Sequence, residues 1–344
     1  MARPDTVSWL AIALLTALSV GCGSDGGRPD PVADAGDAAT DAGVETECSP
    51  NDPRTVPPEP FIGHAGLRAR VVAAFDGATT SLDVATYILD DAPILDALER
   101  AHERGVTVRV LLDAMRSETP AALDRLRAAG IDARTSSPMF THYHPKIALI
   151  DGEIGIVMSA NLNGYSMESE RNHGVVLRDR RDVDHLASVF AVDYAGEPAD
   201  LECTRLVLSP NNSRERIEVL VAGATSELRL QQLSLTDEGV RARIAERADA
   251  GVRVRVILAD PAWIESNTES AAALRASGAE VRFLSVPENH AKLIVADEVA
   301  FVGSENLTWT SLERNREVGV LVSEPDAAGP LIDAFETDWA AASP

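Results

Sequence analysis

Hydrophobic and polar positions along residues 81–130 switch between two repeating patterns. The runs at 81–89 and 106–114 are apolar and rich in β-branched residues, as buried parallel strands are. Between them, residues 90–105 carry apolar side chains at helical spacing, start at an Asp cap and end in Gly; residues 118–130 have the same start and stop signals. The strand–helix–strand order predicts an α/β fold with mixed, largely parallel sheets flanked by helices.

The pattern occurs twice in the chain. GVTVRVLLDA at 105–114 is similar to GVRVRVILAD at 251–260, an offset of 146 residues. After residue 297 the offset becomes 145, which one deleted residue explains. Spacing that stays constant over so many residues predicts two similar α/β lobes, over 59–200 and 201–344, related by a pseudo-twofold axis.

The N-terminal residues have a different character. Residues 9–21 form an apolar stretch that is too short to span a bilayer and is typical of a signal-peptide core. Residues 1–22 resemble a bacterial lipoprotein signal peptide with Cys22 as the lipidated residue; an ordinary secretory peptide cut nearby is the alternative. Residues 23–58, rich in Gly, Ala, Asp and Pro, predict a disordered tether. We therefore expect a lipid-anchored protein at the periplasmic face of the outer membrane or on the cell surface.

Charge and cysteine content narrow the possibilities. The formal net charge is −23, with 54 acidic against 31 basic residues. Proteins that bind nucleic acid neutralise phosphates with Lys and Arg, so no nucleic-acid partner is expected. In an oxidising envelope compartment, Cys48 and Cys203 are predicted to form a disulfide; two buried unpaired thiols are the alternative.

The chain contains only two lysines, and each lies in one copy of the same motif. The motif reads His-x-Lys-x-x-x-x-Asp and comprises His144, Lys146, Asp151 and His290, Lys292, Asp297. Residues two apart on a strand point to the same face, so each His and its Lys are expected to project together. Asp151-Gly152 is a hairpin signal, so the two aspartates are expected mainly to organise turns.

A hydroxyl and an amide follow each motif, in Ser159, Asn161 and Ser304, Asn306. Bringing the halves together therefore gathers two imidazoles, two ammonium groups, two hydroxyls and two amides. No carboxylate cluster or Cys/His set predicts a metal site, and no cofactor is expected. The set suits a phosphodiester, because its transition state needs fixed positive charge and hydrogen-bond donors. One histidine can attack phosphorus while the other serves as general acid and base.

This duplicated motif resembles the phospholipase D superfamily over about residues 60–341. The resemblance implies a two-lobed α/β sandwich with its active site at the lobe interface, a phosphohistidine intermediate and no metal requirement. In that family an acidic residue after Ser-x-Asn orients the histidine of the opposite half. Glu317 occupies this position in the second half and would hold His144 as the nucleophile. Asn172 occupies it in the first half, so His290 would be the general acid and base.

The chain departs from the family pattern at two positions in the first half. Met158 stands where a glycine usually precedes the serine, and Asn172 replaces the acid. Glu170 or His173 could substitute for that acid, or both are merely solvated. Trp263 and Trp309 fall on loops expected near the mouth of the site, where they would contact a lipid or headgroup; core packing or an ordinary rim position is the alternative.

The resemblance and the predicted anchor favour hydrolysis of phospholipids to phosphatidic acid, or exchange of the headgroup. A lipid-anchored enzyme is held beside its substrate, which raises the effective concentration. A nuclease of the same superfamily and a catalytically inactive envelope binding protein are the alternatives. Since both motifs lie in one chain, an active site does not require dimerisation, and a monomer is expected.

Overall fold

The computed structural model describes residues 51–197, 201 and 203–344. These residues belong to one compact unit. The predicted signal peptide, most of the predicted tether, Cys22 and Cys48 lie outside them, and the predictions made there stay predictions. Within the described ranges, no helix combines the length and the apolar composition that crossing a bilayer requires.

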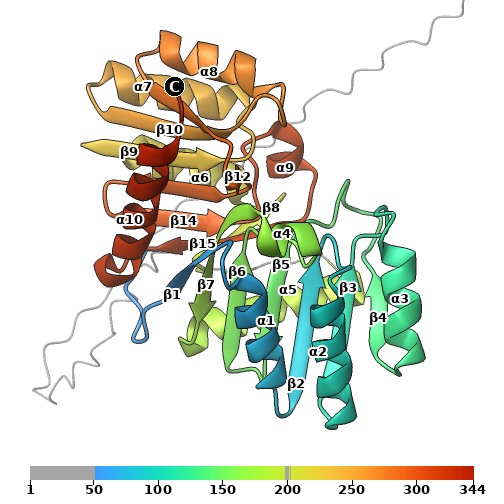
Figure 1. Cartoon of the computed structure of the whole chain (residues 1–344). Coiled ribbons are helices and arrows are strands. Elements are labelled where there is room, and N and C mark those ends of the chain that lie inside the picture. Colours follow the sequence, from blue (N-terminus) through green and yellow to red (C-terminus); the bar gives the residue numbers. More distant parts are fainter. Residues whose placement is uncertain (1–50, 198–200, 202) are drawn as a thin grey trace, which may run out of the picture. The chain divides into compact units, whose positions relative to one another are not determined.

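The first half of the chain builds one sheet in the order β1–β7–β6–β5–β2–β3–β4. Its strands are β1 (Glu59–Gly63), β2 (Ser81–Thr86), β3 (Thr107–Leu112), β4 (Asp132–Thr135), β5 (Lys146–Ile150), β6 (Ile154–Met158) and β7 (Glu170–Leu177). Its outer face is covered by α1 (Leu67–Asp76), α2 (Ala92–Glu103) and α3 (Thr119–Ala128), as Figure 1 shows. The local sequence explains α2: the Asp91 side chain caps it by accepting a hydrogen bond from the Ile94 amide, and apolar residues at helical spacing face the sheet.

The second half repeats this arrangement in the order β11–β10–β9–β13–β14–β15–β8. Its strands are β8 (Leu206–Ser209), β9 (Glu227–Gln232), β10 (Arg253–Ala259), β11 (Glu280–Leu284), β13 (Lys292–Ala296), β14 (Val299–Gly303) and β15 (Glu317–Val322). Its outer helices are α6 (Ser213–Gly223), α7 (Glu238–Asp249) and α8 (Asn267–Ala276). The short helices α4 (Gly164–Glu168) and α9 (Trp309–Glu313) precede β7 and β15.

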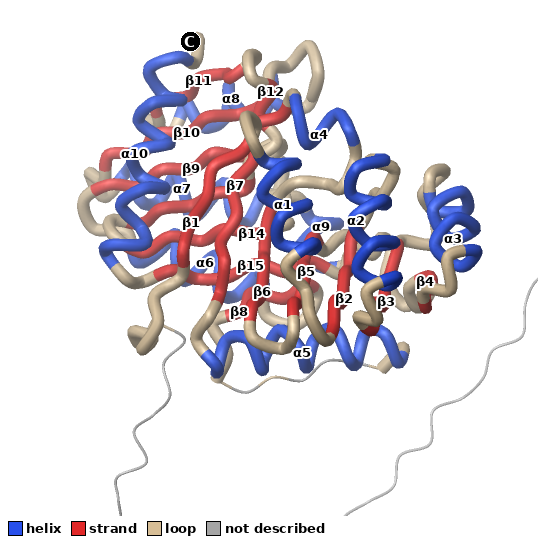
Figure 2. Tube along the Cα trace, turned by 60° about the horizontal axis from the view of Figure 1, so that its bottom comes forward, coloured by secondary structure: helices blue, strands red, loops and turns tan. Residues whose placement is uncertain are grey.

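The inner faces of the two sheets share one apolar layer. The long helices α5 (Arg180–Ala195) and α10 (Pro325–Ala341) contribute side chains to it, and Figure 2 shows α10 running beside β1 and the second sheet. Ile147 and Leu149 of β5 and Leu293 and Val295 of β13 lie in this layer, as expected from their alternation with the motif lysines. The predicted α/β fold of two similar lobes is confirmed.

The predicted balance of strand directions is wrong. The pairs β2–β3, β3–β4, β9–β10 and β10–β11 are parallel, as is the short pairing of β12 (Glu288–Asn289) with β7, but the other neighbours within each sheet are antiparallel. The reason is the length of the connections. A tight turn at Asp151-Gly152 joins β5 to β6, and the turn at Asp297 joins β13 to β14; such short links can only make antiparallel pairs.

The two motif aspartates organise these turns, as predicted. Asp151 accepts hydrogen bonds from the amides of residues 79–81, at the start of β2, and Asp297 accepts them from the amides of residues 225–227, at the start of β9. Both aspartates have positive φ angles, 56° and 53°, which tight turns require. Each lies at the end of its strand remote from the motif lysine, so its role is structural.

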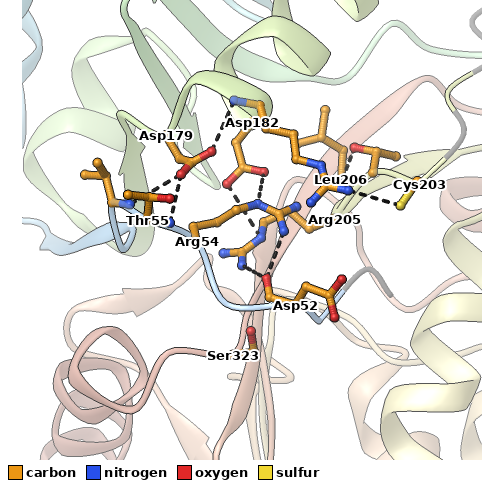
Figure 3. Close-up of polar contacts among 12 residues, drawn as sticks. Asp52, Arg54, Thr55, Asp179, Asp182, Cys203, Arg205, Leu206 and Ser323 are labelled. Carbon is orange, nitrogen blue, oxygen red and sulfur yellow. Dashed lines mark hydrogen bonds and ion pairs between the residues drawn. The ribbon is translucent and has the colours of Figure 1, made fainter. Parts of the chain in front are cut away.

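A buried ionic network fastens the segment before β1 to both lobes (Figure 3). The Nε of Arg54 donates to Asp182 at the start of α5 at 2.8 Å, and the Arg54 amide donates to Glu324 before α10. Arg205 beside β8 donates to both Glu324 oxygens and to the carbonyl of Asp52. Removing one member of such a buried pair would leave its partner's charge uncompensated, which typically costs about 3–5 kcal/mol. The prediction that the disordered tether runs to residue 58 is therefore wrong for residues 51–58, which these contacts fix against both lobes.

The link between the lobes carries Cys203, which is disulfide-bonded. Its Sγ lies 3.3 Å from Nη2 of Arg181 on α5 (Figure 3). The predicted partner Cys48 falls outside the described residues, so the Cys48–Cys203 pairing remains a prediction.

Candidate active site

Backbone hydrogen bonds between the lobes place each motif histidine. The amide of His144 donates to the carbonyl of Arg316 at 2.8 Å, and the amide of His290 donates to the carbonyl of Arg171 at 3.0 Å. The second contact extends a pairing between β12 (Glu288–Asn289) and β7. Each histidine therefore lies just before its own strand, beside the opposite lobe's strand that carries the acid or its replacement.

Two buried ion pairs fix the same interface. Arg316 contacts Asp193 of α5 at 2.8 Å, and Arg171 contacts Asp338 of α10 at 2.9 Å. Each pair joins one lobe to the other, and the two are related by the 145-residue offset. The sequence analysis missed them, although the signal was present: the repeated segments FAVDY and FETDW each contain the aspartate. These pairs keep the acid-bearing strands in register with the histidines.

His144 is bonded to Glu317, as predicted. Its Nδ1 lies 2.6 Å from Oε2 of the fully buried Glu317. Burial lowers the pKa of His144 to about 4, against the opposing effect of Glu317. Although burial raises the pKa of Glu317, its contacts with His144 and Lys146 outweigh that effect and lower it. A neutral His144 that donates its Nδ1 proton to a carboxylate keeps the lone pair on Nε2, the tautomer that a nucleophile needs.

His290 faces Asn172, also as predicted. Its Nδ1 lies 3.0 Å from the Asn172 carbonyl oxygen and 3.5 Å from Oε2 of Glu170. Burial, followed by the charges of Lys292 and Lys146, lowers the pKa of His290 well below its usual value. His173 bonds Gln231 at 3.1 Å, so of the two suggested substitutes for the missing acid only Glu170 reaches His290.

The two lysines lie fully buried at the centre of this arrangement. Each Nζ donates to the carbonyl of its own motif histidine at 2.7 Å. Burial lowers the pKa of Lys146 to about 7, and burial together with Lys146 lowers the pKa of Lys292 well below its usual value. Two buried ammonium groups that repel each other are stabilised by an anion between them, so the pair fits a phosphate.

The predicted serines and asparagines lie just beyond β6 and β14. Ser159 donates to the Asn172 side chain at 2.8 Å, and Ser304 donates to Glu317 at 2.6 Å. These serines therefore support the groups that hold the histidines. The side-chain oxygens of Asn161 and Asn306 are buried and have no hydrogen-bond partner among the described residues. Because an amide oxygen only accepts hydrogen bonds, these two atoms could bind a water or an alcohol hydroxyl rather than a phosphate oxygen.

An aromatic ring that the sequence analysis missed closes one side of the site. The Tyr87 ring stands edge-on to His144, with centroids 4.5 Å apart, and Lys146 Nζ lies 5.3 Å from its centroid. Its counterpart in the second half is Leu233, so the duplication gave no signal for it. On the other side, the ring centroids of Trp263 and His290 lie 6.3 Å apart. Trp263 is 38% exposed, as a residue at the mouth of the site would be.

The Met158 departure has a packing explanation. In the second half, the carboxyl group of Glu305 occupies the space beside Gly303 and Gly319, where an added Cβ would come within 2.8 Å of it. In the first half, Met158 corresponds to Gly303 and Ala160 corresponds to Glu305. The Met158 side chain packs in the outer core. One long side chain is thus present on each side but starts from a different residue.

Glu305 itself is a buried carboxyl group that is expected to stay protonated. Its side chain is fully buried, and neither oxygen has a well-formed hydrogen bond among the described residues. Burial, and then the charge of Glu317, raise its pKa well above the usual value. Sequence reasoning treated this residue only as a spacer between Ser304 and Asn306.

We expect a Glu305→Gln variant to be more stable than the wild type as the pH rises above about 4.5, where a free Glu ionises. The unfolded chain then releases a proton that the folded chain retains, so wild-type stability falls while the variant escapes this loss. Thermal unfolding at pH 4 to 8 should show that the Tm of the variant exceeds that of the wild type by a difference that grows by a few degrees over this range. An identical difference at every pH, or one that Glu313→Gln also produces, would argue against a protonated Glu305.

Among the described residues, no group of three or more His, Cys, Asp or Glu side chains is arranged to hold a metal ion. The positive charge at the site comes from Lys146 and Lys292. The arrangement can therefore bind one phosphate, attack it with His144 and exchange a proton through His290.

Both lobes match one known family. The family described as "Cardiolipin synthase, PLD-like domain" matches residues 71–194 and 217–339, which is more than half of the chain. The cardiolipin synthase of Listeria monocytogenes serotype 4a is 24% identical over 325 residues, covering 80% of this chain and 67% of the synthase. The mitochondrial cardiolipin hydrolase of Chlamydomonas reinhardtii is 29% identical over 112 residues, covering 32% of this chain and 50% of the hydrolase. This chain thus spans one half to two thirds of these relatives.

Solved structures support the fold. The phosphatidylserine synthase of Haemophilus influenzae has a TM-score of 0.66 at 15% identity, covering 82% of this chain and 85% of that chain. The polyphosphate kinase of Porphyromonas gingivalis has a TM-score of 0.65 at 19% identity, covering 81% and 46%. At such identities the likeness shows the two-lobed fold alone, and the chemistry has to be argued from the site.

Proposed function

Because this chain belongs to the phospholipase D superfamily, we propose that it hydrolyses phospholipids to phosphatidic acid and a headgroup alcohol, or transfers the phosphatidyl group to another alcohol. The superfamily makes it a phosphodiester-acting enzyme; the lipid substrate is the proposal. The observation that carries the reaction is the contact between His144 Nδ1 and Glu317, which leaves Nε2 as the attacking atom. The reaction proceeds in two steps through this histidine.

In the first step, Nε2 of His144 attacks phosphorus and the bond from phosphorus to the headgroup oxygen breaks. The leaving oxygen takes a proton from His290, which becomes protonated when the anionic substrate binds and offsets the lysine charges that lower its pKa. Lys146 and Lys292 stabilise the charge on the equatorial oxygens. In the second step, water or an alcohol gives its proton to His290 and attacks phosphorus. The phosphorus–nitrogen bond breaks, His144 is restored, and phosphatidic acid or a new phosphodiester leaves.

Apolar side chains beside the site support a lipid substrate. Met115, Trp263 and Val286 are more than a third exposed and lie on loops near the motif segments. Trp309 is also more than a third exposed, but the prediction that it lies on a loop is wrong, because it is the first residue of α9. A pocket of about 470 Å³ is lined by Tyr165, Trp263 and Glu288 among others, and the Trp263 ring centroid lies 6.3 Å from that of His290. Aromatic residues at such positions suit the boundary between lipid and water. The acidic charge of the chain favours this substrate over nucleic acid.

The predicted anchor completes the proposal. A lipid on Cys22, followed by the tether, would hold the enzyme beside a bilayer in the cell envelope. The disulfide at Cys203 supports an exported location, since such bonds persist in oxidising compartments. The finer assignments of headgroup and membrane rest on experiment.

The proposal is tested with the soluble form that begins after Cys22, mixed phosphatidylcholine micelles and ethanol. We expect phosphatidic acid and phosphatidylethanol, identified by mass spectrometry, because a covalent intermediate can pass to either acceptor. A matched incubation with plasmid DNA serves as the comparison. Cleavage of DNA with no lipid product from dispersed micelles would replace the phospholipase by a nuclease. Binding without any product would favour the inactive binding protein.

A further inference from the structure

The two lobes carry the same acid and amide in exchanged positions. Residues 170–172 read Glu-Arg-Asn, and residues 315–317, at the 145-residue offset, read Asn-Arg-Glu. Each triplet therefore contains one carboxylate and one amide, and only their order differs. The first lobe has not lost its acid but holds it two residues earlier in the strand.

The middle arginines show that the two triplets have equivalent orientations. Arg171 and Arg316 each form an ion pair with the opposite lobe, through Asp338 and Asp193. Residues two apart on a strand share a face, so both outer positions of each triplet point away from the arginine, toward the site. The exchanged side chains consequently reach the same small volume in each lobe.

The local hydrogen bonds follow the carboxylate wherever it stands. In the second lobe, Ser311 of α9 and the Asn315 side chain both donate to Glu317, at 2.6 and 2.9 Å. In the first lobe, Ser166 of α4 donates to Glu170, and the Asn172 amide lies 3.3 Å from the Ser166 hydroxyl. The serine thus fixes an acid in both lobes, although from different strand positions.

We propose that Glu170 is the carboxylate that orients His290, as Glu317 orients His144, while the Asn172 oxygen is the nearer hydrogen-bond acceptor of its Nδ1. Glu170 is buried, and its Oε2 lies 3.5 Å from His290 Nδ1. The other charged or titratable groups around His290 are Lys292, Lys146 and His144. Glu170 is therefore the one carboxylate that the described contacts place against this imidazole, and it acts as a positioning residue.

The exchange also accounts for the division of labour between the histidines. His144 touches a carboxylate directly, which suits a group that must carry positive charge throughout the covalent intermediate. The nearest acceptor of His290 is the Asn172 amide oxygen at 3.0 Å, and the Glu170 carboxylate lies at 3.5 Å, a looser contact that suits a group that gives up a proton and takes it back. This inference rests on the proposed two-step phosphodiesterase mechanism and identifies how its acid and base is tuned.

The test uses Glu170→Gln and a series of diaryl phosphates, from bis(p-nitrophenyl) phosphate to diphenyl phosphate. Single-turnover release of the first phenol reports the step in which His290 acts as acid. A p-nitrophenolate leaves without protonation, so we expect its release to change by about twofold or less. Release of phenol needs the proton, and its rate should fall about 10- to 100-fold. Glu168→Gln, an exposed change two residues away, should alter neither.

The double variant Glu170→Asn, Asn172→Glu recreates the order of the second lobe and should restore phenol release to within about threefold of the wild type. An equal loss on every ester would reduce Glu170 to a structural residue, and an unchanged phenol rate would overturn the proposal. Because these esters are not lipids, the outcome is independent of the phospholipid assays. Turnover of diaryl phosphates without any lipid product would overturn the lipid substrate alone.

Discussion

A His144→Ala variant should lose phosphodiesterase activity by at least about 10⁴-fold, the scale on which removal of a catalytic nucleophile acts. No other side chain among the described residues combines the position of His144 with a hydrogen bond to Glu317. The covalent intermediate should vanish with the activity. Mass spectrometry of protein quenched in acid-free buffer during turnover would detect a phosphoryl adduct on the wild type and none on the variant.

His290→Ala provides the contrast within the same site. Without the general acid, alkyl esters should react about 10²–10⁴-fold more slowly, but an ester with a p-nitrophenolate leaving group should still load His144. Because water then lacks its base, the adduct on His144 should accumulate. His102→Ala on α2, away from the motif segments, serves as the control for histidine loss. An adduct on His290 in the His144 variant would reverse the assignment of the two histidines.

The chemistry of the site was predictable because two local motifs carry it. The duplicated His and Lys residues and the Glu317–His144 and Asn172–His290 contacts follow from spacing and family resemblance, and the structure places them as expected. Ser159 and Ser304, which were predicted to bind the substrate, donate instead to Asn172 and Glu317. The strand directions were not predicted correctly. An apolar strand has the same composition in either direction, and only the short turns at the motif aspartates determine it.

The supporting residues escaped prediction for a different reason. Tyr87, the cross-lobe ion pairs of Arg171 and Arg316, and the buried Glu305 act through contacts between segments far apart in the chain. A single sequence does not state such contacts. The ion pairs left a trace because both halves repeat them, whereas Tyr87 left none because the second half has Leu233 instead. An internal duplication thus reveals the contacts that both lobes share and conceals those that make the site asymmetric.

Lys146→Arg should lower activity by about 10²–10³-fold even though it preserves the positive charge. The Lys146 ammonium is fully buried, donates to the His144 carbonyl and lies against the Tyr87 ring. A guanidinium is planar and larger and carries five donors, so in this volume it would displace its neighbours or leave donors unpaired. We expect the loss mainly in kcat. The misplaced charge would still stabilise the bound substrate, but it would stabilise the transition state to a smaller extent.

The pH dependence distinguishes this explanation from a general disturbance of the fold. The pKa of Lys146 is lowered to about 7, so in the wild type kcat/KM should fall as the pH rises above that value and Lys146 loses its proton. Arginine stays protonated, so the residual activity of Lys146→Arg should lack the part of this limb that Lys146 produces and keep only what the lowered pKa of Lys292 contributes. Arg100→Lys at an exposed pair on α2 should leave rate and profile unchanged. Full activity in Lys146→Arg would show that charge alone suffices, and the use of lysine at both motif positions would then need another explanation. A low rate with the limb preserved would assign the limb to a different group.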